Sequence, residues 1–155
     1  MTKFLTSLPD ADLKLALLKI SDRWFVFPQR DIGALESTYD IDTHEAEPFS
    51  VGRINYQNQG WPVYCLSPEL SLLSGIPAER RACILLSAGA GYIGVLFDEI
   101  SIAKQEVLGI RQELPPAMRL PDTPVIGLVQ LAGDNVACIT GAEQITAHIE
   151  RLAKI

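Results

Sequence analysis

Cysteine and histidine, the side chains of most metal sites and many nucleophilic sites, are scarce in this sequence. Its 155 residues include three cysteines, Cys65, Cys83 and Cys138, and two histidines, His44 and His148. The cysteines are odd in number, lie far apart and form no C-x-x-C pair, which argues against a disulfide framework and against a zinc site. This cysteine usage fits a reducing compartment, so we expect the protein in the cytoplasm.

Basic residues are also fewer than acidic residues. Lys and Arg number 13 against 19 Asp and Glu, which gives a formal net charge of -6. Affinity for a nucleic-acid backbone depends on clustered Lys and Arg that release counterions. Nucleic acid is therefore not expected as a partner.

Long apolar runs are missing as well. No stretch approaches the roughly 20 apolar residues that a membrane-spanning helix needs, so no membrane insertion is expected. Asp10, Asp12 and Lys14 interrupt the first apolar stretch and no small-residue cleavage pattern follows, so we expect no signal peptide. The overall composition, 48% hydrophobic and 21% charged, is typical of a folded domain.

Short apolar runs separated by tight turns are what the sequence has instead. Three pairs of runs predict β-hairpins: residues 13–20 with 24–27, residues 83–87 with 92–97, and residues 125–131 with 136–139. The connecting residues are polar or glycine-rich, and the runs favour β-branched and aromatic side chains. The pattern predicts an all-β fold with small barrels.

An acidic loop, a short strand and the first of two small helices are expected in the middle of the chain. Residues 38–50 form an acidic, exposed loop, and residues 61–66 form a short strand that carries Pro62 at an edge or near the strand start. Ser67 and Pro68 then predict a brief helix, with serine as its cap and proline in its first turn.

The second helix is expected at the end of the chain. Thr140 and Glu143 match the capping box, in which two side chains satisfy the first backbone N–H groups of a helix. Ile145, Ile149 and Leu152 then follow on one face.

One motif suggests a cofactor but lies in the wrong context. Residues 89–94 match the dinucleotide fingerprint G-x-G-x-x-G letter for letter. That fingerprint needs a helix N-terminus to meet the pyrophosphate, whereas residues 92–97 are typical of a strand. We expect a hairpin here and no cofactor.

No set of residues predicts catalysis or metal binding. Cys65 could serve as a nucleophile only with a base, and the two histidines, His44 and His148, fall in the acidic loop and the terminal helix. Asp98 and Glu99 close a strand and are expected to face solvent. No catalytic residue and no metal ligand is predicted.

Four segments, in order along the chain, resemble one known family. They are the opening hairpin at residues 13–34, the stretch Gly52-Arg53-Ile54-Asn55-Tyr56-Gln57-Asn58 with Pro62-Val63-Tyr64-Cys65-Leu66, the strands at residues 84–100, and the closing hairpin at residues 126–139. The second segment resembles the pattern G-x-x-N-x-R-G-x-x-x-P-x-x-D-L, and the third resembles V-G-x-x-V-D-x-V. These are patterns of the CheW-like domains, which are adaptors of bacterial chemosensory arrays.

The resemblance implies a fold and a role. The CheW-like domain is expected over residues 11–146, with an N-terminal extension at 1–10 and a C-terminal helix at 141–155. The implied fold is two SH3-like, five-stranded β-barrels packed side by side, without a catalytic site. Members of the family couple chemoreceptor signalling tips to the regulatory domain of a histidine kinase, and these are the partners that the resemblance implies.

Several positions depart from the family pattern. Gln57 and Asn58 stand where the family has arginine and glycine, and Cys65 stands where it has aspartate. The acidic residue usual near the end of the second strand is also missing, since the aligned position is about Ala34. Because charged groups at a docking surface set partner choice, these changes predict an altered docking surface.

The partner-binding residues predicted from this segment are Asn55, Gln57, Asn58 and Trp61. One alternative is a binding module whose CheW-like fold serves another protein or a small ligand, with Trp61 as an exposed anchor. Trp61 is equally explained as a core residue, because tryptophan is largely buried in most proteins. An enzyme built on Cys65 is the third hypothesis.

Overall fold

A computed structural model of the chain describes residues 14–45, 47–104, 111–112, 123–131 and 135–153. The predicted extension at 1–10 lies outside the described residues. So do the first residue of the first predicted strand, positions 133–134 of the third turn, and the last two residues of the predicted terminal helix.

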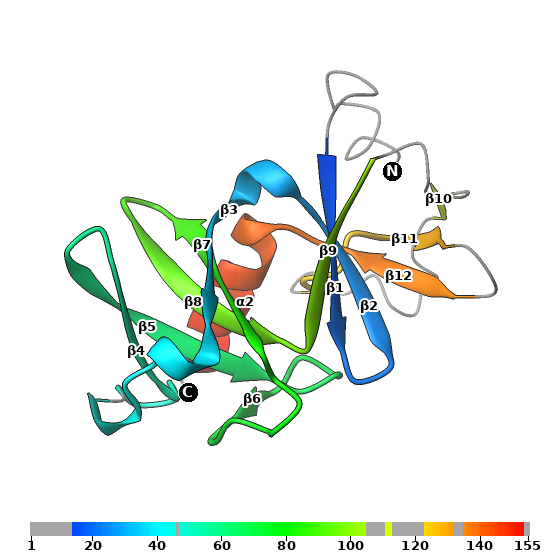
Figure 1. Cartoon of the computed structure of the whole chain (residues 1–155). Coiled ribbons are helices and arrows are strands. Elements are labelled where there is room, and N and C mark those ends of the chain that lie inside the picture. The colour runs from blue at the N-terminus through cyan, green and yellow to red at the C-terminus, as the bar shows by residue number, and fades with distance from the viewer. Residues whose placement is uncertain (1–13, 46, 105–110, 113–122, 132–134, 154–155) are drawn as a thin grey trace.

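The first of two curled sheets combines the first two strands of the chain with its last four (Figure 1). Its strand order is β10-β11-β12-β2-β1-β9, with β12 and β2 parallel and the other neighbours antiparallel. The strands are β1 (Lys14–Ile20), β2 (Arg23–Pro28), β9 (Glu99–Lys104), β10 (Arg111–Gln112), β11 (Gly127–Gln130) and β12 (Val136–Ile139).

The second sheet is formed by the middle of the chain. Its order is β3-β7-β8-β5-β4, with β5 and β8 parallel, and a short β6 pairs with β5. The strands are β3 (Ile32–Ser37), β4 (Gly52–Tyr56), β5 (Gln59–Leu66), β6 (Leu72–Leu73), β7 (Ala82–Ala88) and β8 (Gly91–Phe97).

The predicted fold class is confirmed. Each sheet has five main strands and one two-residue strand, β10 in the first and β6 in the second. The chain leaves the first sheet after β2 and returns to it with β9, so the two subdomains are intertwined (Figure 1). The three predicted hairpins are present as β1–β2, β7–β8 and β11–β12.

The main core lies between the two sheets. Phe97 of β8 packs edge-on against Phe25 and Phe27 of β2, with ring centroids 6.3 and 6.0 Å apart. The terminal helix, α2 (Ala142–Ala153), adds Ile145 and Ile149 to the same cluster. None of the helices in the described part of the chain is long and apolar enough to cross a membrane.

The prediction of a helix beginning at Ser67 was wrong. This segment is a turn, in which the Ser67 hydroxyl accepts a hydrogen bond from the Ser71 backbone N–H at 3.1 Å. Leu70 has a positive φ of 66°, which a helix does not allow. The serine therefore closes a turn, and the chain passes directly into β6.

The predicted capping box at the start of α2 was also wrong. The Thr140 hydroxyl donates to the Pro124 carbonyl at 2.8 Å, so it does not cap the helix. The Asp31 carboxylate, 111 positions earlier in the chain, accepts a hydrogen bond from the Ala142 N–H at 2.9 Å. Asp31 lies in a one-turn 3-10 helix, η1 (Gln29–Asp31), which connects the two sheets.

Replacing Asp31 by alanine is expected to lower the free energy of unfolding by about 1 kcal/mol. The reason is that the first N–H of α2 loses its acceptor and the positive end of the helix dipole loses a negative charge. Urea denaturation followed by circular dichroism measures the change. The control is Asp22→Ala in the exposed β1–β2 turn, for which we expect little change; equal losses for the two variants would contradict this capping role.

Candidate functional site

The β4–β5 hairpin carries three of the four predicted site residues at its tip. Tyr56 pairs with Gln59, which leaves Gln57 and Asn58 as a two-residue turn with φ angles of 53° and 64°. Two successive positive φ values are typical of the tight turns that match the twist of a hairpin. The turn therefore presents Gln57 and Asn58 in a fixed geometry.

An aromatic cluster supports this turn from below. The Trp61 indole Nε1 donates to the Tyr56 carbonyl at 3.0 Å. The Tyr92 ring of β8 packs edge-on against both, 5.2 Å from the Tyr56 ring and 5.5 Å from the Trp61 ring. Only glycine fits at Gly91, because a Cβ there would lie 2.5 Å from the indole.

Trp61 is half-buried and belongs to the hydrophobic cluster of the second sheet. It thus lies beneath the turn rather than beside Asn55, Gln57 and Asn58 on its exposed surface. Pro62 follows in β5, one residue before the parallel pairing with β8 begins at Val63. It is the fourth of the eight residues of β5, which lies between β8 and β4, so the prediction that it lies at a sheet edge or near a strand start was wrong.

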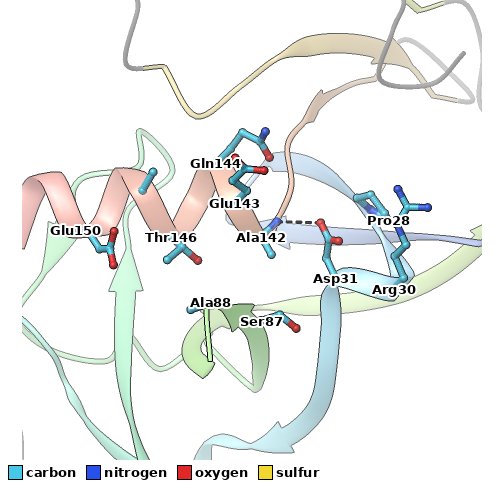
Figure 2. Close-up of a pocket in the computed structure, with 12 residues that line it drawn as sticks. Pro28, Arg30, Asp31, Ser87, Ala88, Ala142, Glu143, Gln144, Thr146 and Glu150 are labelled. Atoms are coloured by element: carbon cyan, nitrogen blue, oxygen red, sulfur yellow. Dashed lines mark hydrogen bonds between the residues drawn. The ribbon is translucent and has the colours of Figure 1, made fainter. Parts of the chain in front are cut away.

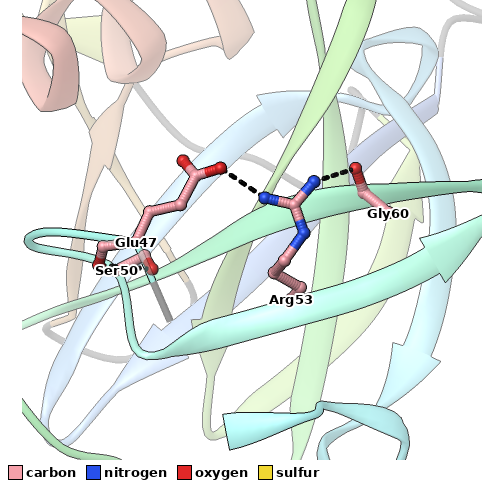
Figure 3. Close-up of polar contacts among 4 residues, drawn as sticks. All are labelled: Glu47, Ser50, Arg53 and Gly60. Atoms are coloured by element: carbon pink, nitrogen blue, oxygen red, sulfur yellow. Dashed lines mark hydrogen bonds and ion pairs between the residues drawn. The ribbon is translucent and has the colours of Figure 1, made fainter. Parts of the chain in front are cut away.

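Arg53 ties the acidic loop to the hairpin (Figure 3). Its guanidinium forms an ion pair with the Glu47 carboxylate and donates to the Gly60 carbonyl at 2.7 Å. The backbone of Arg53 exchanges hydrogen bonds of 2.8 and 3.0 Å with Asp42 in the loop. The loop, predicted as exposed, contains two one-turn 3-10 helices, η2 (Thr38–Asp40) and η3 (Thr43–Glu45), and buries Ile41.

The tip itself is polar and open to solvent. Asn55, Gln57, Asn58 and Gln59 are all exposed. A shallow hollow of about 450 Å³ is lined by residues 55–58. The sequence prediction named three residues of this tip. It missed Tyr92, because nothing in the local sequence indicates that β8 lies beside β5, and it missed Arg53, whose contacts with Glu47 and Gly60 depend on the fold.

A buried ion pair lies where the β1–β2 turn meets the second sheet. The Arg80 guanidinium, which is 3% exposed, donates through Nε to Asp98 Oδ1 at 2.9 Å. The other oxygen of Asp98 accepts from the Ser21 N–H at 2.8 Å. The expectation that Asp98 faces solvent was therefore wrong, because the carboxylate neutralises a buried cation.

Cys65 takes part in the same network. Arg80 Nη1 donates to the Cys65 sulfur at 3.2 Å. Cys65 stands where the family pattern described above has an aspartate. Burial raises the pKa of the Cys65 thiol, and the neighbouring guanidinium only partly opposes this shift. A buried, protonated thiol is a packing group and a poor nucleophile.

Cys83 is buried, Cys138 is half-buried, both ring nitrogens of His148 have partners, and His44 is exposed in the acidic loop. Burial raises the pKa of Cys83 to about 12 and raises that of Cys138. His148 Nε2 lies 2.7 Å from the Leu70 carbonyl, and its Nδ1 lies 2.8 Å from Arg151 Nη2. Because a carbonyl only accepts and a guanidinium only donates, this ring is the neutral tautomer with its proton on Nε2.

Thiol labelling checks this description. At pH 8 we expect Cys65 and Cys83 of the folded protein to react with a disulfide reagent far more slowly than free cysteine, because only the thiolate attacks and burial disfavours it. Cys138, which is half-buried, is expected to react first. Labelling in urea gives the full reactivity as the control; rapid modification of Cys65 in the folded protein would support an enzymatic role instead.

A larger open cleft, of about 720 Å³, lies between α2 and the β7–β8 turn (Figure 2). Arg30, Ser87, Thr146 and Glu150 are among its lining residues. The Thr146 hydroxyl has no hydrogen-bond partner among the described residues. Across all the residues that the structure describes, no group of three or more His, Cys, Asp or Glu side chains is placed to hold a metal ion.

The comparisons with known proteins identify the fold. No protein-family model matches the chain, and no curated protein matches its sequence. Among solved structures, the chain is similar to the crystal structure of the scaffolding protein TtCheW from Thermoanaerobacter tengcongensis, with a TM-score of 0.61. The match covers 83% of this chain and 88% of that chain at 16% sequence identity. The chain therefore has a CheW-like fold, as the resemblance predicted.

Proposed function

We propose that the protein is a non-enzymatic adaptor of chemotaxis-type signal transduction, which couples chemoreceptors to a histidine kinase in the cytoplasm. The observation that carries the proposal is the likeness of fold to a scaffolding protein over most of both chains. The four sequence segments that resemble CheW-like domains support the same role. Its implied partners are the chemoreceptor signalling tip and the regulatory domain of the kinase.

The chemistry of the described residues supports a binding role. The thiols of Cys65 and Cys83 are buried, with raised pKa values. Both ring nitrogens of His148 already have partners, the Leu70 carbonyl and the Arg151 guanidinium. A cysteine nucleophile needs an accessible thiolate, and burial withholds one from Cys65 and Cys83.

The proposed docking surface is the β4–β5 tip with Asn55, Gln57 and Asn58. Trp61 contributes by supporting the turn, through its hydrogen bond to the Tyr56 carbonyl. The two turn positions are uncharged where the family pattern has arginine and glycine. We propose that this exchange changes which kinase or receptor is bound, in a system that includes pilus-driven or surface motility.

The adaptor role is tested by assembly of three components. Purified protein, receptor signalling tip and kinase regulatory domain from the same organism are expected to sediment together as one complex. Asn55→Ala should weaken this assembly, whereas Asn135→Ala, which changes another exposed asparagine far from the tip, should leave it intact. A well-folded protein that joins neither component overturns the proposal.

A binding module for another protein or a small ligand is the second candidate. The observation that favours it is the 720 Å³ cleft beside α2, a volume in the range of small-molecule sites. Failure of the assembly test, together with a ligand-induced shift of α2 resonances in a small-molecule screen, would favour this candidate.

A further inference from the structure

The tip of the β4–β5 hairpin is uncharged in a strongly charged protein. Residues 54–66 contain no Asp, Glu, Lys or Arg, although the chain has 32 of them, 13 basic and 19 acidic. The nearest cation, Arg53, is already bound to the Glu47 carboxylate and the Gly60 carbonyl (Figure 3). A partner that approaches the tip therefore meets no available charge from this segment.

Four carboxamide side chains cover the same tip. Asn55, Gln57, Asn58 and Gln59 are exposed, and within the described residues none of them makes a side-chain hydrogen bond. Each carboxamide has two N–H donors and an acceptor oxygen. The tip thus presents a dense set of neutral donors and acceptors that are free to bind another molecule.

The backbone beneath these amides is held in place before any partner arrives. Gln57 adopts a positive φ of 53°, an uncommon conformation for a residue other than glycine, asparagine or aspartate. The hydrogen bond from Trp61 and the packing of Tyr92 hold the turn in this form. A fixed turn lowers the entropic cost of docking.

We infer that this tip docks on a neutral polar surface of the partner protein, one that offers peptide groups and uncharged polar side chains. The inference rests on the adaptor function proposed above and names the chemistry of its partner. A charged partner side chain buried against the carboxamides would lose water without gaining a counter-charge, which is unfavourable. Amide and peptide groups replace their hydrogen bonds to water with equivalent ones.

Two charge variants at one position test the inference. The dissociation constants of Gln57→Glu and Gln57→Arg are measured by calorimetry against the kinase regulatory domain and against the receptor tip. For the partner that docks on the turn, both variants are expected to bind about tenfold more weakly than the natural chain, whatever the sign of the new charge. Both substitutions keep an unbranched side chain, so the turn geometry is equally served.

Matched controls separate this local effect from the change in net charge. Gln130→Glu and Gln130→Arg place the same charges on an exposed glutamine of β11, and we expect their dissociation constants to stay within about twofold of the natural value. Binding of the natural chain is also expected to vary little between low and high salt, because a neutral contact is not screened.

Three other outcomes would contradict the inference. If one Gln57 variant strengthens binding and the other weakens it, the partner surface is charged and the inference is wrong while the adaptor function stands. If neither variant changes binding, the tip is not the docking surface and the inference is equally overturned. If the natural chain binds neither partner, the proposed function fails, and the inference fails with it.

Discussion

Replacement of Arg80 by alanine is expected to lower the free energy of unfolding by about 3–5 kcal/mol. The guanidinium is 3% exposed and the Asp98 carboxylate that it neutralises is 13% exposed. Removing the cation leaves that carboxylate enclosed without a counter-charge, and it also removes the donor to the Cys65 sulfur. Urea unfolding, followed by tryptophan fluorescence, measures the loss.

Arg81 provides the matched control for this variant. It is the next residue in the chain, and it is exposed. Arg81→Ala is expected to change stability by no more than about 0.5 kcal/mol. Adding Asp98→Ala to Arg80→Ala should restore part of the loss, because no unpaired charge then remains. Similar small losses for both arginine variants would show that the buried ion pair is unimportant.

Replacement of Phe97 by alanine has an expected effect of the same size, about 3–5 kcal/mol. The ring is 2% exposed and packs edge-on against Phe25 and Phe27 of the other sheet. Alanine would remove these contacts and leave a cavity between the subdomains. Thermal unfolding by calorimetry should therefore show a large fall in the melting temperature.

Tyr39 is the aromatic control for Phe97. Its side chain is 96% exposed, so Tyr39→Ala removes an aromatic ring without opening a cavity. A change within about 0.5 kcal/mol is expected for it. If Phe97→Ala cost no more than Tyr39→Ala, the cluster between the sheets could not be the main source of stability.

The local patterns of the sequence predicted most of the strands. The apolar runs on either side of residues 21–23 and 88–91 predicted the hairpins β1–β2 and β7–β8. Strand patterns and turn residues act over only a few positions, so the local sequence is enough to find them. The strand pattern also correctly predicted that residues 89–94 belong to a hairpin. The turn at Gln57 and Asn58 was proposed from the resemblance to CheW-like domains and not from local rules.

Interactions between distant residues were beyond such rules. The cap of α2 comes from Asp31, although Thr140 has the right spacing for a local cap. Asp98 looked exposed at the end of a strand, yet it meets Arg80 and the Ser21 N–H. In both cases a tertiary contact determined the role of a polar side chain, and only the three-dimensional structure reveals that contact.

The candidate site shows the same division. The polar residues of the tip can be read from the sequence, whereas their support by Tyr92 depends on the pairing of β5 with β8, in which the partner residues are 31 positions apart. Trp61 could not be assigned as anchor or core from its neighbours alone. In the structure its indole supports the turn with a hydrogen bond to Tyr56.

The proposed adaptor role requires this chain to bind a histidine kinase. Titration calorimetry of the purified protein against the kinase regulatory domain from the same organism tests it most directly. We predict a saturable heat of binding that weakens when Gln57 is changed to glutamate or arginine. A folded sample that gives no heat, at concentrations where the natural chain and the kinase domain both remain monodisperse, would contradict the claim.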